Sequence, residues 1–345
     1  MTSTMKRTAD QRESFYRLLP ELLVQDERVV LVLPEIGAAY LEPHLTPDIR
    51  SRVVNVGIRE QAMIGVAGGM SLAGMRPIVH TFPPFLIERP FEQVKLDLGH
   101  QDVGAILVSS GGSYGWPQGG ETHFGQRDVA LLDTLDGWTV HVPGHVDEVE
   151  WMLRGAVASD DRVYIRLDGV SNDHSYGRPG GSMTVLQQGN SGTVISVGPM
   201  TDRVLAAASG RDVTVMHAST IRPFDGTTLR ETLTAPDIMI VEPYLAGTSV
   251  PQIDRGMADI RHRVLGIGVE PGERRKYGTV AQHDRANGLD IEGLSRSMTT
   301  SSSDQCRRRS YLSLVTLYAD SRSSPICDSV CEDGLTTDNQ PAVPY

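Results

Sequence analysis

Short runs of β-branched and other apolar residues alternate with longer amphipathic segments along most of the 345-residue chain. The runs of the first half are VVLVLP, RVVNVG, RPIVHTF, AILVSS, WTVHVP and VYIRLD, at 29–34, 52–57, 76–82, 105–110, 138–143 and 163–168. They are continuously apolar, which is typical of parallel strands covered on both faces. Helical patterns lie between them, at 9–24, 59–74, 85–99 and 146–158. This alternation predicts an α/β domain built on a parallel sheet.

A second and shorter series of the same kind follows a polar segment rich in Gly and Pro, SNDHSYGRPGGS. Its apolar runs are TVISVG, VTVMHA, IMIVEP and VLGIGV, at 193–198, 213–218, 238–243 and 264–269, with helical patterns around 201–209 and 250–261. A polar Gly/Pro segment is typical of a linker. We therefore expect two consecutive parallel-sheet α/β domains, at 5–180 and at 186–296, of which the second is smaller.

The alternation ends near residue 297, and the segment 297–345 is rich in Ser, Thr and Asp. Such a composition buries too little apolar surface to offset the entropy of ordering, so we expect a disordered tail. The chain has three cysteines, Cys306, Cys327 and Cys331, and all of them lie in this tail. The body of the protein therefore has neither a disulfide framework nor a four-cysteine zinc site, and we predict no metal ligands in it.

Charge and hydropathy exclude several classes of function. The formal net charge of −11 leaves no basic surface of the kind that nucleic acids require. No apolar run approaches the roughly 18 residues of a membrane span, and the N-terminal segment lacks the apolar core of a secretory signal. These observations predict a cytoplasmic protein that binds neither nucleic acid nor membranes.

The segment 53–82 is the most informative part of the sequence. A predicted strand ends at Gly57, and a predicted helix begins around Glu60 and carries several glycines and alanines. A glycine inside a helix costs about 1 kcal/mol relative to alanine, so several of them indicate close approach of another helix or of a cofactor. Taken alone, Glu60 is most simply a first-turn carboxylate that the helix dipole favours.

Several motifs together change this interpretation. They are Gly57-Ile58-Arg59-Glu60-Gln61, Gly74-Met75-Arg76-Pro77, Phe82-Pro83-Pro84-Phe85, the opening strand 192–198, Thr220-Ile221-Arg222-Pro223-Phe224-Asp225 and the closing segment 277–290. Over about residues 5–296 the chain resembles the transketolase and deoxyxylulose-phosphate-synthase family of thiamine diphosphate enzymes. The resemblance covers the family's pyrimidine-binding domain and its C-terminal domain, and it implies the C-terminal subunit of a split transketolase.

The resemblance gives Glu60 a chemical role. Thiamine diphosphate must lose the proton at C2 of its thiazolium ring, and its own amino group removes that proton. A carboxylate bonded to N1′ of the pyrimidine favours the tautomer that does so, and it works best if burial raises its pKa enough for it to share the proton. The cofactor supplies the carbanion chemistry, and the protein supplies orientation.

The resemblance also implies roles for neighbouring side chains. Phe85 matches the aromatic residue that stacks on the pyrimidine, while Phe82 and Phe91 lie near it in sequence and fit core packing equally well. The loop Gly119-Gly120-Glu121-Thr122-His123 resembles the family's D-G-x-T-H loop. His123 is expected to donate a hydrogen bond, or pass a proton, to a substrate oxygen. Because Gly119 stands where the family has Asp, the resemblance does not imply that this chain shares the family's usual sugar specificity.

Two arginines are candidates for binding a substrate phosphate. Arg166, at the end of VYIRLD, matches a phosphate-binding arginine of the family, and its alternative is an ion pair with Asp168 or a neighbour. Arg89 is the second candidate, because a guanidinium is a good bidentate partner for phosphate.

The motifs that hold the diphosphate are absent from the sequence. It contains no G-D-G motif, which in the family leads to Mg²⁺ on the diphosphate, and no Gly-rich loop followed by Lys-Ser/Thr. The resemblance therefore implies half a site. The other half, with Mg²⁺ held mainly there, is expected on a separate N-terminal transketolase subunit in an α2β2 heterotetramer. The implied reaction moves a two-carbon ketol unit from a ketose, in its phosphorylated form, to an aldehyde acceptor.

Two alternatives remain. The β subunit of a 2-oxoacid dehydrogenase E1 component has a similar length and the same two domains, but it typically reads H-S-Q where this chain reads Thr122-His123-Phe124-Gly125-Gln126. The other is a catalytically idle paralogue that scaffolds or regulates a partner, against which the intact Glu60 argues.

Overall fold

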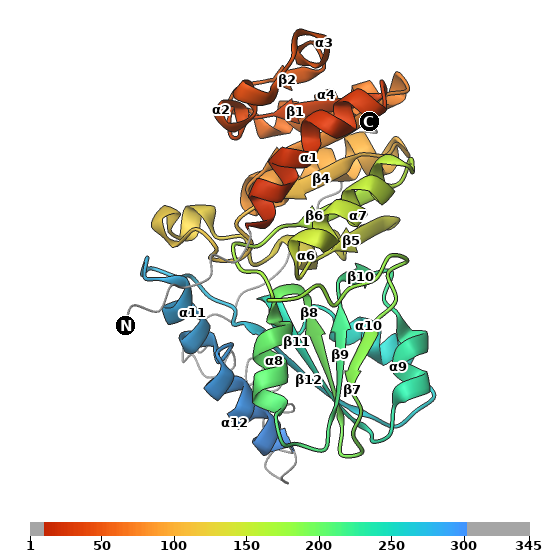
Figure 1. Ribbon diagram of the computed structural model, residues 1–345, viewed down its shortest axis with the longest axis vertical. Coiled ribbons are helices and arrows are strands. Elements are labelled where there is room, and N and C mark those ends of the chain that lie inside the picture. Colours follow the sequence, from red (N-terminus) through yellow and green to blue (C-terminus); the bar gives the residue numbers. More distant parts are fainter. Residues whose placement is uncertain (1–9, 302–345) are drawn as a thin grey trace, which may run out of the picture. The chain divides into compact units, whose positions relative to one another are not determined.

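A computed structural model describes residues 10–301 of the chain (Figure 1). The expectation of a disordered tail falls almost entirely on 302–345, outside the described residues, and so do all three cysteines. Only the first residues of that predicted tail are described, and they belong to the last helix, α12 (Ile291–Ser301), which continues past residue 297.

The first half of the chain forms a seven-stranded sheet with the strand order β10-β5-β6-β4-β3-β1-β2. Its strands are β1 (Val29–Leu33), β2 (Val53–Asn55), β3 (Arg76–Thr81), β4 (Ile106–Ser109), β5 (Trp138–His141), β6 (Arg162–Arg166) and β10 (Thr220–Arg222). All pairs are parallel except that of β10 with β5, since β10 arrives from the second half of the chain and adds an antiparallel edge. The predicted parallel α/β architecture is confirmed.

Side chains alternate between the two faces of this sheet, and helices cover both. The helices are α1 (Gln11–Gln25), α2 (Ala38–Leu41), α3 (Pro47–Arg50), α4 (Glu60–Leu72), α5 (Phe91–Gln93), α6 (Asp128–Leu132) and α7 (Val146–Val157). On one face, α1 and α7 pack on side chains such as Leu31 and Ile106. On the other face, α4 packs on side chains such as Val32 and Leu107. Burial on both faces explains why the strand sequences are continuously apolar.

The helix predicted over 85–99 is the main departure in this half. In its place, two π-helical turns, Pro84–Glu88 and Val94–His100, flank the single turn of α5. Pro90 lacks a backbone N–H and cannot continue a regular helix. Such π-turns occur frequently at functional sites.

The second half forms a five-stranded sheet with the order β12-β11-β8-β9-β7. Its elements are β7 (Thr184–Gln187), β8 (Thr193–Val197), α8 (Thr201–Ala208), β9 (Thr214–Ala218), α9 (Gly226–Thr232), β11 (Asp237–Leu245), α10 (Val250–Gly256), β12 (Arg263–Val269), α11 (Val280–Asn287) and α12. Only the edge strand β7 is antiparallel. In Figure 1, α8, α11 and α12 lie on one side of this sheet and α9 and α10 on the other.

One cluster of buried apolar side chains continues from the first sheet into the second, from Val79 and Leu107 to Ile195 and Met216. The domain boundaries at 180 and 186 stay a prediction. Within residues 10–301, no helix has both the length and the apolar character that crossing a membrane requires.

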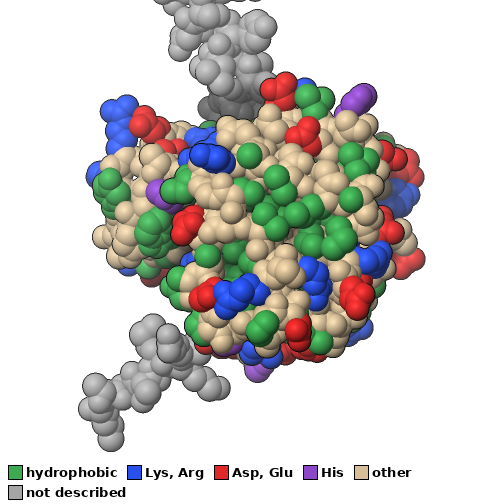
Figure 2. All heavy atoms as spheres, turned by 90° about the horizontal axis from the view of Figure 1, so that it is seen from above, with side chains coloured by type: hydrophobic (Ala, Val, Ile, Leu, Met, Phe, Trp, Pro, Cys, Tyr) green, Lys and Arg blue, Asp and Glu red, His purple; other side chains and the backbone are tan. Residues whose placement is uncertain are grey.

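Helix α4 leaves one apolar side uncovered in this chain. Ile58, just before it, is 74% exposed, and Leu72, at its end, is 62% exposed. Ala62 and Gly69 are exposed on the same helix. Figure 2 shows hydrophobic side chains gathered on the face seen from above, the end at which β2 and α4 lie in Figure 1.

Candidate functional site

A tight turn places Glu60 at the first position of α4. Gly57 has a φ of 69°, a conformation that favours glycine, and it lets the chain turn after β2. The side-chain oxygen of Asn55 fixes the turn, because it accepts the backbone N–H of Gly57 at 2.9 Å and that of Glu35 at 3.0 Å. The helix N-terminus in turn stabilises a negative charge on Glu60.

Glu60 is a buried carboxylate with a single side-chain partner. It is 2% exposed, and its Oε2 accepts a hydrogen bond of 2.7 Å from Nη1 of Arg89. Within residues 10–301, its second oxygen, Oε1, makes no hydrogen bond. A carboxylate oxygen that makes no hydrogen bond can take a proton or a donor from a bound molecule.

Arg89 also contacts the aromatic ring predicted to bind the cofactor. Its guanidinium carbon lies 4.2 Å from the centroid of the Phe85 ring, within the range of a cation–π contact. Phe85 and Arg89 are four residues apart across the first π-turn, a spacing that brings side chains to one side of a helical turn. The structure therefore brings Glu60, Phe85 and Arg89 together.

His123 stands edge-on in a cluster of three aromatic rings. Its ring centroid lies 5.0 Å from that of Phe85, 5.7 Å from that of Phe82 and 4.8 Å from that of Trp116, with interplanar angles of 74–85°. Phe82 and Trp116 stack in parallel at 5.4 Å. This packing fixes the orientation of the imidazole beside Phe85.

The hydrogen bonds of His123 indicate which nitrogen is available to a ligand. Nδ1 lies 2.9 Å from the hydroxyl oxygen of Thr122 and 3.2 Å from the carbonyl oxygen of Gly119. A carbonyl oxygen only accepts, so this contact favours the proton on Nδ1. Among the described residues nothing hydrogen-bonds to Nε2, which in the neutral ring then carries a lone pair.

The loop that carries His123 is anchored from both halves of the chain. Glu121 accepts a bond from Arg127 at 3.3 Å and one from the backbone N–H of Arg274 at 3.0 Å. A Cβ atom on Gly119 would lie 2.7 Å from atoms of both His123 and Trp116. The family's Asp could not be placed here without displacing these rings, which accounts for the glycine.

The other two predicted residues, Phe91 and Arg166, lie in or against the core of the first sheet. Phe91 is half-buried and packs against the core of the first sheet. Arg166 is fully buried, where its Nε donates to Asp128 at 2.8 Å and its Nη2 to Ser113 at 2.7 Å. The carboxylate of Asp168 lies farther away, with its Oδ2 at 3.5 Å from Nη1 of Arg166. The phosphate-binding role of Arg166 stays a prediction, and it would require a guanidinium that is enclosed in this structure to become accessible.

The environment of Arg166 favours its charge. Burial, the largest single effect, lowers the pKa of the guanidinium, but Asp128, Tyr164 and Asp168 together more than offset it, and the pKa of Arg166 is raised above its ordinary value. Tyr164 completes the network by donating its hydroxyl hydrogen to Asp128 at 2.6 Å. These groups form an interior ion pair, in which Nη1 of Arg166 is buried and has no hydrogen-bond partner among the described residues.

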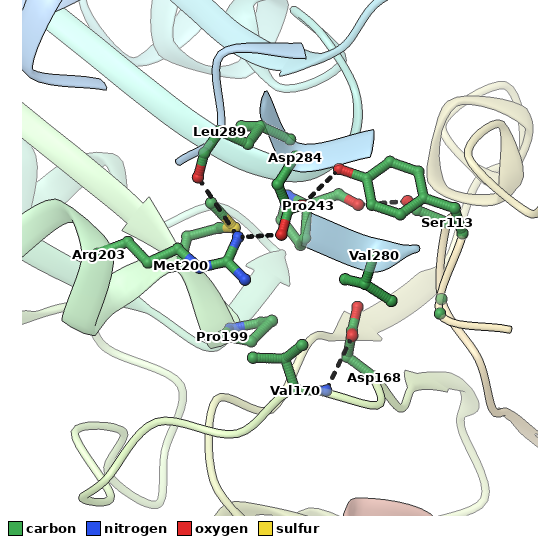
Figure 3. Close-up of a pocket in the computed structure, with 13 residues that line it drawn as sticks. Ser113, Asp168, Val170, Pro199, Met200, Arg203, Pro243, Val280, Asp284 and Leu289 are labelled. Carbon is green, nitrogen blue, oxygen red and sulfur yellow. Dashed lines mark hydrogen bonds and ion pairs between the residues drawn. The ribbon is translucent and has the colours of Figure 1, made fainter. Parts of the chain in front are cut away.

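A small cavity of about 30 Å³ lies between the two sheets (Figure 3). Asp284 accepts bonds there from the hydroxyl of Tyr114 at 2.7 Å and from Arg203 at 2.9 Å. Burial raises the pKa of the nearby Asp168. The cavity has room for a water molecule and no larger ligand, and none of the predicted site residues lines it.

Trp116 is the site residue that sequence reasoning missed. It is 42% exposed and covers the ring of Phe82 beside His123. A tryptophan in a loop with Gly111, Gly112, Gly115, Gly119 and Gly120 was the available signal, because exposed aromatic side chains on loops are typical of binding sites.

Comparisons with known proteins agree with this geometry. Residues 7–169 match the family model of the transketolase pyrimidine-binding domain. The chain is 44% identical over 295 residues to an uncharacterized 33.6 kDa protein in the fasciation locus of Rhodococcoides fascians, an alignment that covers 84% of this chain and 94% of that protein. It is 27% identical to the 6-deoxy-6-sulfo-D-fructose transketolase subunit SqwH of Clostridium sp. (strain MSTE9), over 62% of this chain and 69% of that one.

The fold has a counterpart among solved structures. A split-gene transketolase, solved as an inactive β4 tetramer, superimposes with a TM-score of 0.71 over 85% of this chain and 98% of that one, at 22% identity. The likeness to this structure shows the fold, and the family model carries the assignment. The chain belongs to the transketolase family of thiamine-dependent proteins.

Proposed function

We propose that the chain is the pyrimidine-binding subunit of a two-chain, thiamine diphosphate-dependent transketolase. The observation that carries the proposal is the buried Glu60 at the start of α4, with one oxygen unbonded and with Phe85 beside its arginine partner. A relative that is named as a transketolase subunit supports the two-chain arrangement.

The residues fit the pyrimidine end of the cofactor. A planar guanidinium already bonds to Glu60 and lies over Phe85, so the space between them accepts a flat group with N–H donors at its edge. An aminopyrimidine is likewise planar, and its ring nitrogen is an N–H donor to Glu60 when it carries the shared proton. No group of three or more His, Cys, Asp or Glu within residues 10–301 could hold a metal ion. We accordingly assign the diphosphate and Mg²⁺ to a partner.

Each side chain of the site then has a task. When bound, thiamine diphosphate supplies the carbanion centre that allows cleavage of a bond next to a ketone. Glu60 would hold a proton in the hydrogen bond to the pyrimidine ring nitrogen, and Phe85 would stack on the ring. His123, whose Nε2 is unbonded, would contact a substrate oxygen. Phe82 and Trp116 keep the imidazole in place and limit the access of water.

The exposed apolar side of α4 favours assembly with another chain. Contiguous exposed apolar surface is typical of interaction sites, and here it begins two residues from Glu60, at Ile58. We propose that the diphosphate-binding subunit, or the second copy of this chain in an α2β2 heterotetramer, covers this surface. The half-site would then be completed next to Glu60.

The proposed reaction is transfer of a two-carbon ketol unit from a ketose, in its phosphorylated form, to an aldehyde. The phosphate would be bound by an arginine that reaches the site, and Arg89 is the better placed candidate because its side chain is 39% exposed, whereas Arg166 is enclosed.

Reconstitution tests the proposal. The purified chain, a candidate partner with a diphosphate-binding domain, and the mixture are titrated with thiamine diphosphate and Mg²⁺ by calorimetry. We expect tight binding and ketol transfer from the mixture alone. Micromolar binding and full turnover by the lone chain would contradict the split site. Turnover of 2-oxoacids only would support an E1 β subunit, and a complex without cofactor binding would support an idle paralogue.

A further inference from the structure

Arg89 makes two contacts that the proposed function reserves for the cofactor. Its Nη1 donates to the Oε2 of Glu60, and its guanidinium carbon lies over the ring of Phe85, 4.2 Å from the centroid. These are its only side-chain interactions within residues 10–301. A single flexible side chain therefore occupies both halves of the proposed pyrimidine site at once.

The guanidinium group can replace an aminopyrimidine because the two share their recognition chemistry. Both are planar and both stack on an aromatic face, and the pyrimidine also presents an N–H to Glu60 when its ring nitrogen carries the shared proton. A lysine ammonium has the charge but neither the plane nor the stacking. We propose that Arg89 is a stand-in for the cofactor pyrimidine, which holds Glu60 and Phe85 in their binding arrangement in the unloaded protein and must leave when the cofactor binds. This inference rests on the proposed function.

The unloaded protein needs such a partner for Glu60. A buried carboxylate without a partner is strongly destabilising, and Glu60 is 2% exposed. The bond from Arg89 satisfies one of its oxygens and keeps the side chain aimed at Phe85. The site is thereby pre-organised before the cofactor arrives, which reduces the ordering that binding requires.

The same contact can be exchanged for another. The side chain of Arg89 is 39% exposed, so its guanidinium group can return to water once the cofactor supplies Glu60 with a new partner. Arg89 follows a π-turn and precedes Pro90, so its side chain can rotate toward solvent without disturbing a regular helix. Once displaced, it would lie at the edge of the site, on the side from which a phosphorylated substrate can reach it.

Competition between Arg89 and the cofactor has a measurable consequence. The apparent affinity for the cofactor is reduced by the fraction of molecules in which the site is free. Removal of the guanidinium should therefore tighten binding, whereas removal of an ordinary contact residue would weaken it. This opposite sign separates a stand-in from a residue that touches the bound cofactor.

The test is the affinity of the reconstituted complex for thiamine diphosphate, measured by calorimetry for the wild type, Arg89→Met and Arg89→Lys. Methionine keeps the apolar stem without the guanidinium. We expect Arg89→Met to bind at least about threefold tighter, with Arg89→Lys between it and the wild type. Arg230→Met is the control, because Arg230 is equally exposed at 40% and is paired with Asp259. It should leave the affinity unchanged.

Thermal unfolding gives a second readout. Arg89→Met should lower the melting temperature of the unloaded complex, because Glu60 loses its partner, and the added cofactor should raise it by more than in the wild type. Unchanged or weaker cofactor binding by Arg89→Met, with normal binding by the wild type, would overturn the role of Arg89 alone. Absence of binding by the wild-type complex would overturn the proposed function and this inference together.

Discussion

The substitution Arg166→Met separates an interior ion pair from a phosphate-binding residue. In the structure it removes the 2.8 Å bond to Asp128 and the 2.7 Å bond to Ser113. Asp128, which is fully buried, would keep only the hydroxyl of Tyr164 and the backbone N–H of Val129 as donors. Breaking a buried pair from one side costs about 3–5 kcal/mol, because the remaining charge stays buried without compensation.

We therefore expect Arg166→Met to lower the free energy of unfolding by about 3–5 kcal/mol, measured by urea denaturation of the full chain with circular dichroism. Asp128→Asn in the same chain is the matched control. The double variant has no unpaired charge and retains an acceptor for Tyr164, so it should lose less stability than Arg166→Met alone. A loss below about 1 kcal/mol, together with a raised KM for a phosphorylated substrate, would refute the interior role and support phosphate binding.

Two further predictions concern stability. Burial raises the pKa of Glu242 to about 7, so between about pH 4.5 and 7 the folded protein holds a proton that the unfolded chain has released, and stability falls as pH rises through this interval. The side chain in Glu242→Gln cannot ionise. The free energy of unfolding of this variant, measured by urea denaturation, should match that of the wild type at pH 4 and exceed it by about 3 kcal/mol at pH 8. A difference in unfolding free energy that does not change with pH would contradict this prediction. Gly68→Ala would place a Cβ 2.6 Å from the carbonyl oxygen of Asp97 and should lower the melting temperature, at a cost of about 1–3 kcal/mol. Gly69→Ala in the same helix has no described atom within 4 Å of the new Cβ and should be neutral or stabilising by up to about 1 kcal/mol, and equal effects of the two changes would refute the packing argument.

The strands were predictable from sequence because burial on both faces leaves a continuous apolar signal. Strand β1, predicted at 29–34, is Val29–Leu33 with all five residues buried. The edge strands β7 and β10 were missed, since β7 is only half-buried and β10 has three residues. Helix α11 was missed although its signals were present: Thr279 and Gln282 form a capping box, and Gly288 ends the helix in a left-handed conformation.

Individual pairings in the site were beyond the reach of sequence reasoning. The motif around Glu60 and the aromatic residues after β3 predicted neighbours that the structure does bring together. Nothing in the sequence, however, showed that Arg89 would bond to Glu60, from which it is separated by 29 positions in the sequence. In the same way, Asp128 was not a candidate partner for Arg166. Such contacts depend on strand order and on the π-turns, which periodicity does not encode.

Our central proposal is that Glu60 controls the protonation state of bound thiamine diphosphate, and through it the loss of the C2 proton. The most direct measurement is the exchange of the cofactor's C2 proton in the reconstituted complex, for the wild type and for Glu60→Gln, with the exposed Glu92→Gln as control. Gln keeps the size and a hydrogen bond but cannot hold the proton. We predict exchange slowed on the order of 10²-fold or more in Glu60→Gln, with unchanged melting temperature, and wild-type exchange in the control. Wild-type exchange in Glu60→Gln, with the cofactor shown to be bound, would contradict the account and leave Glu60 as a carboxylate that merely begins a helix.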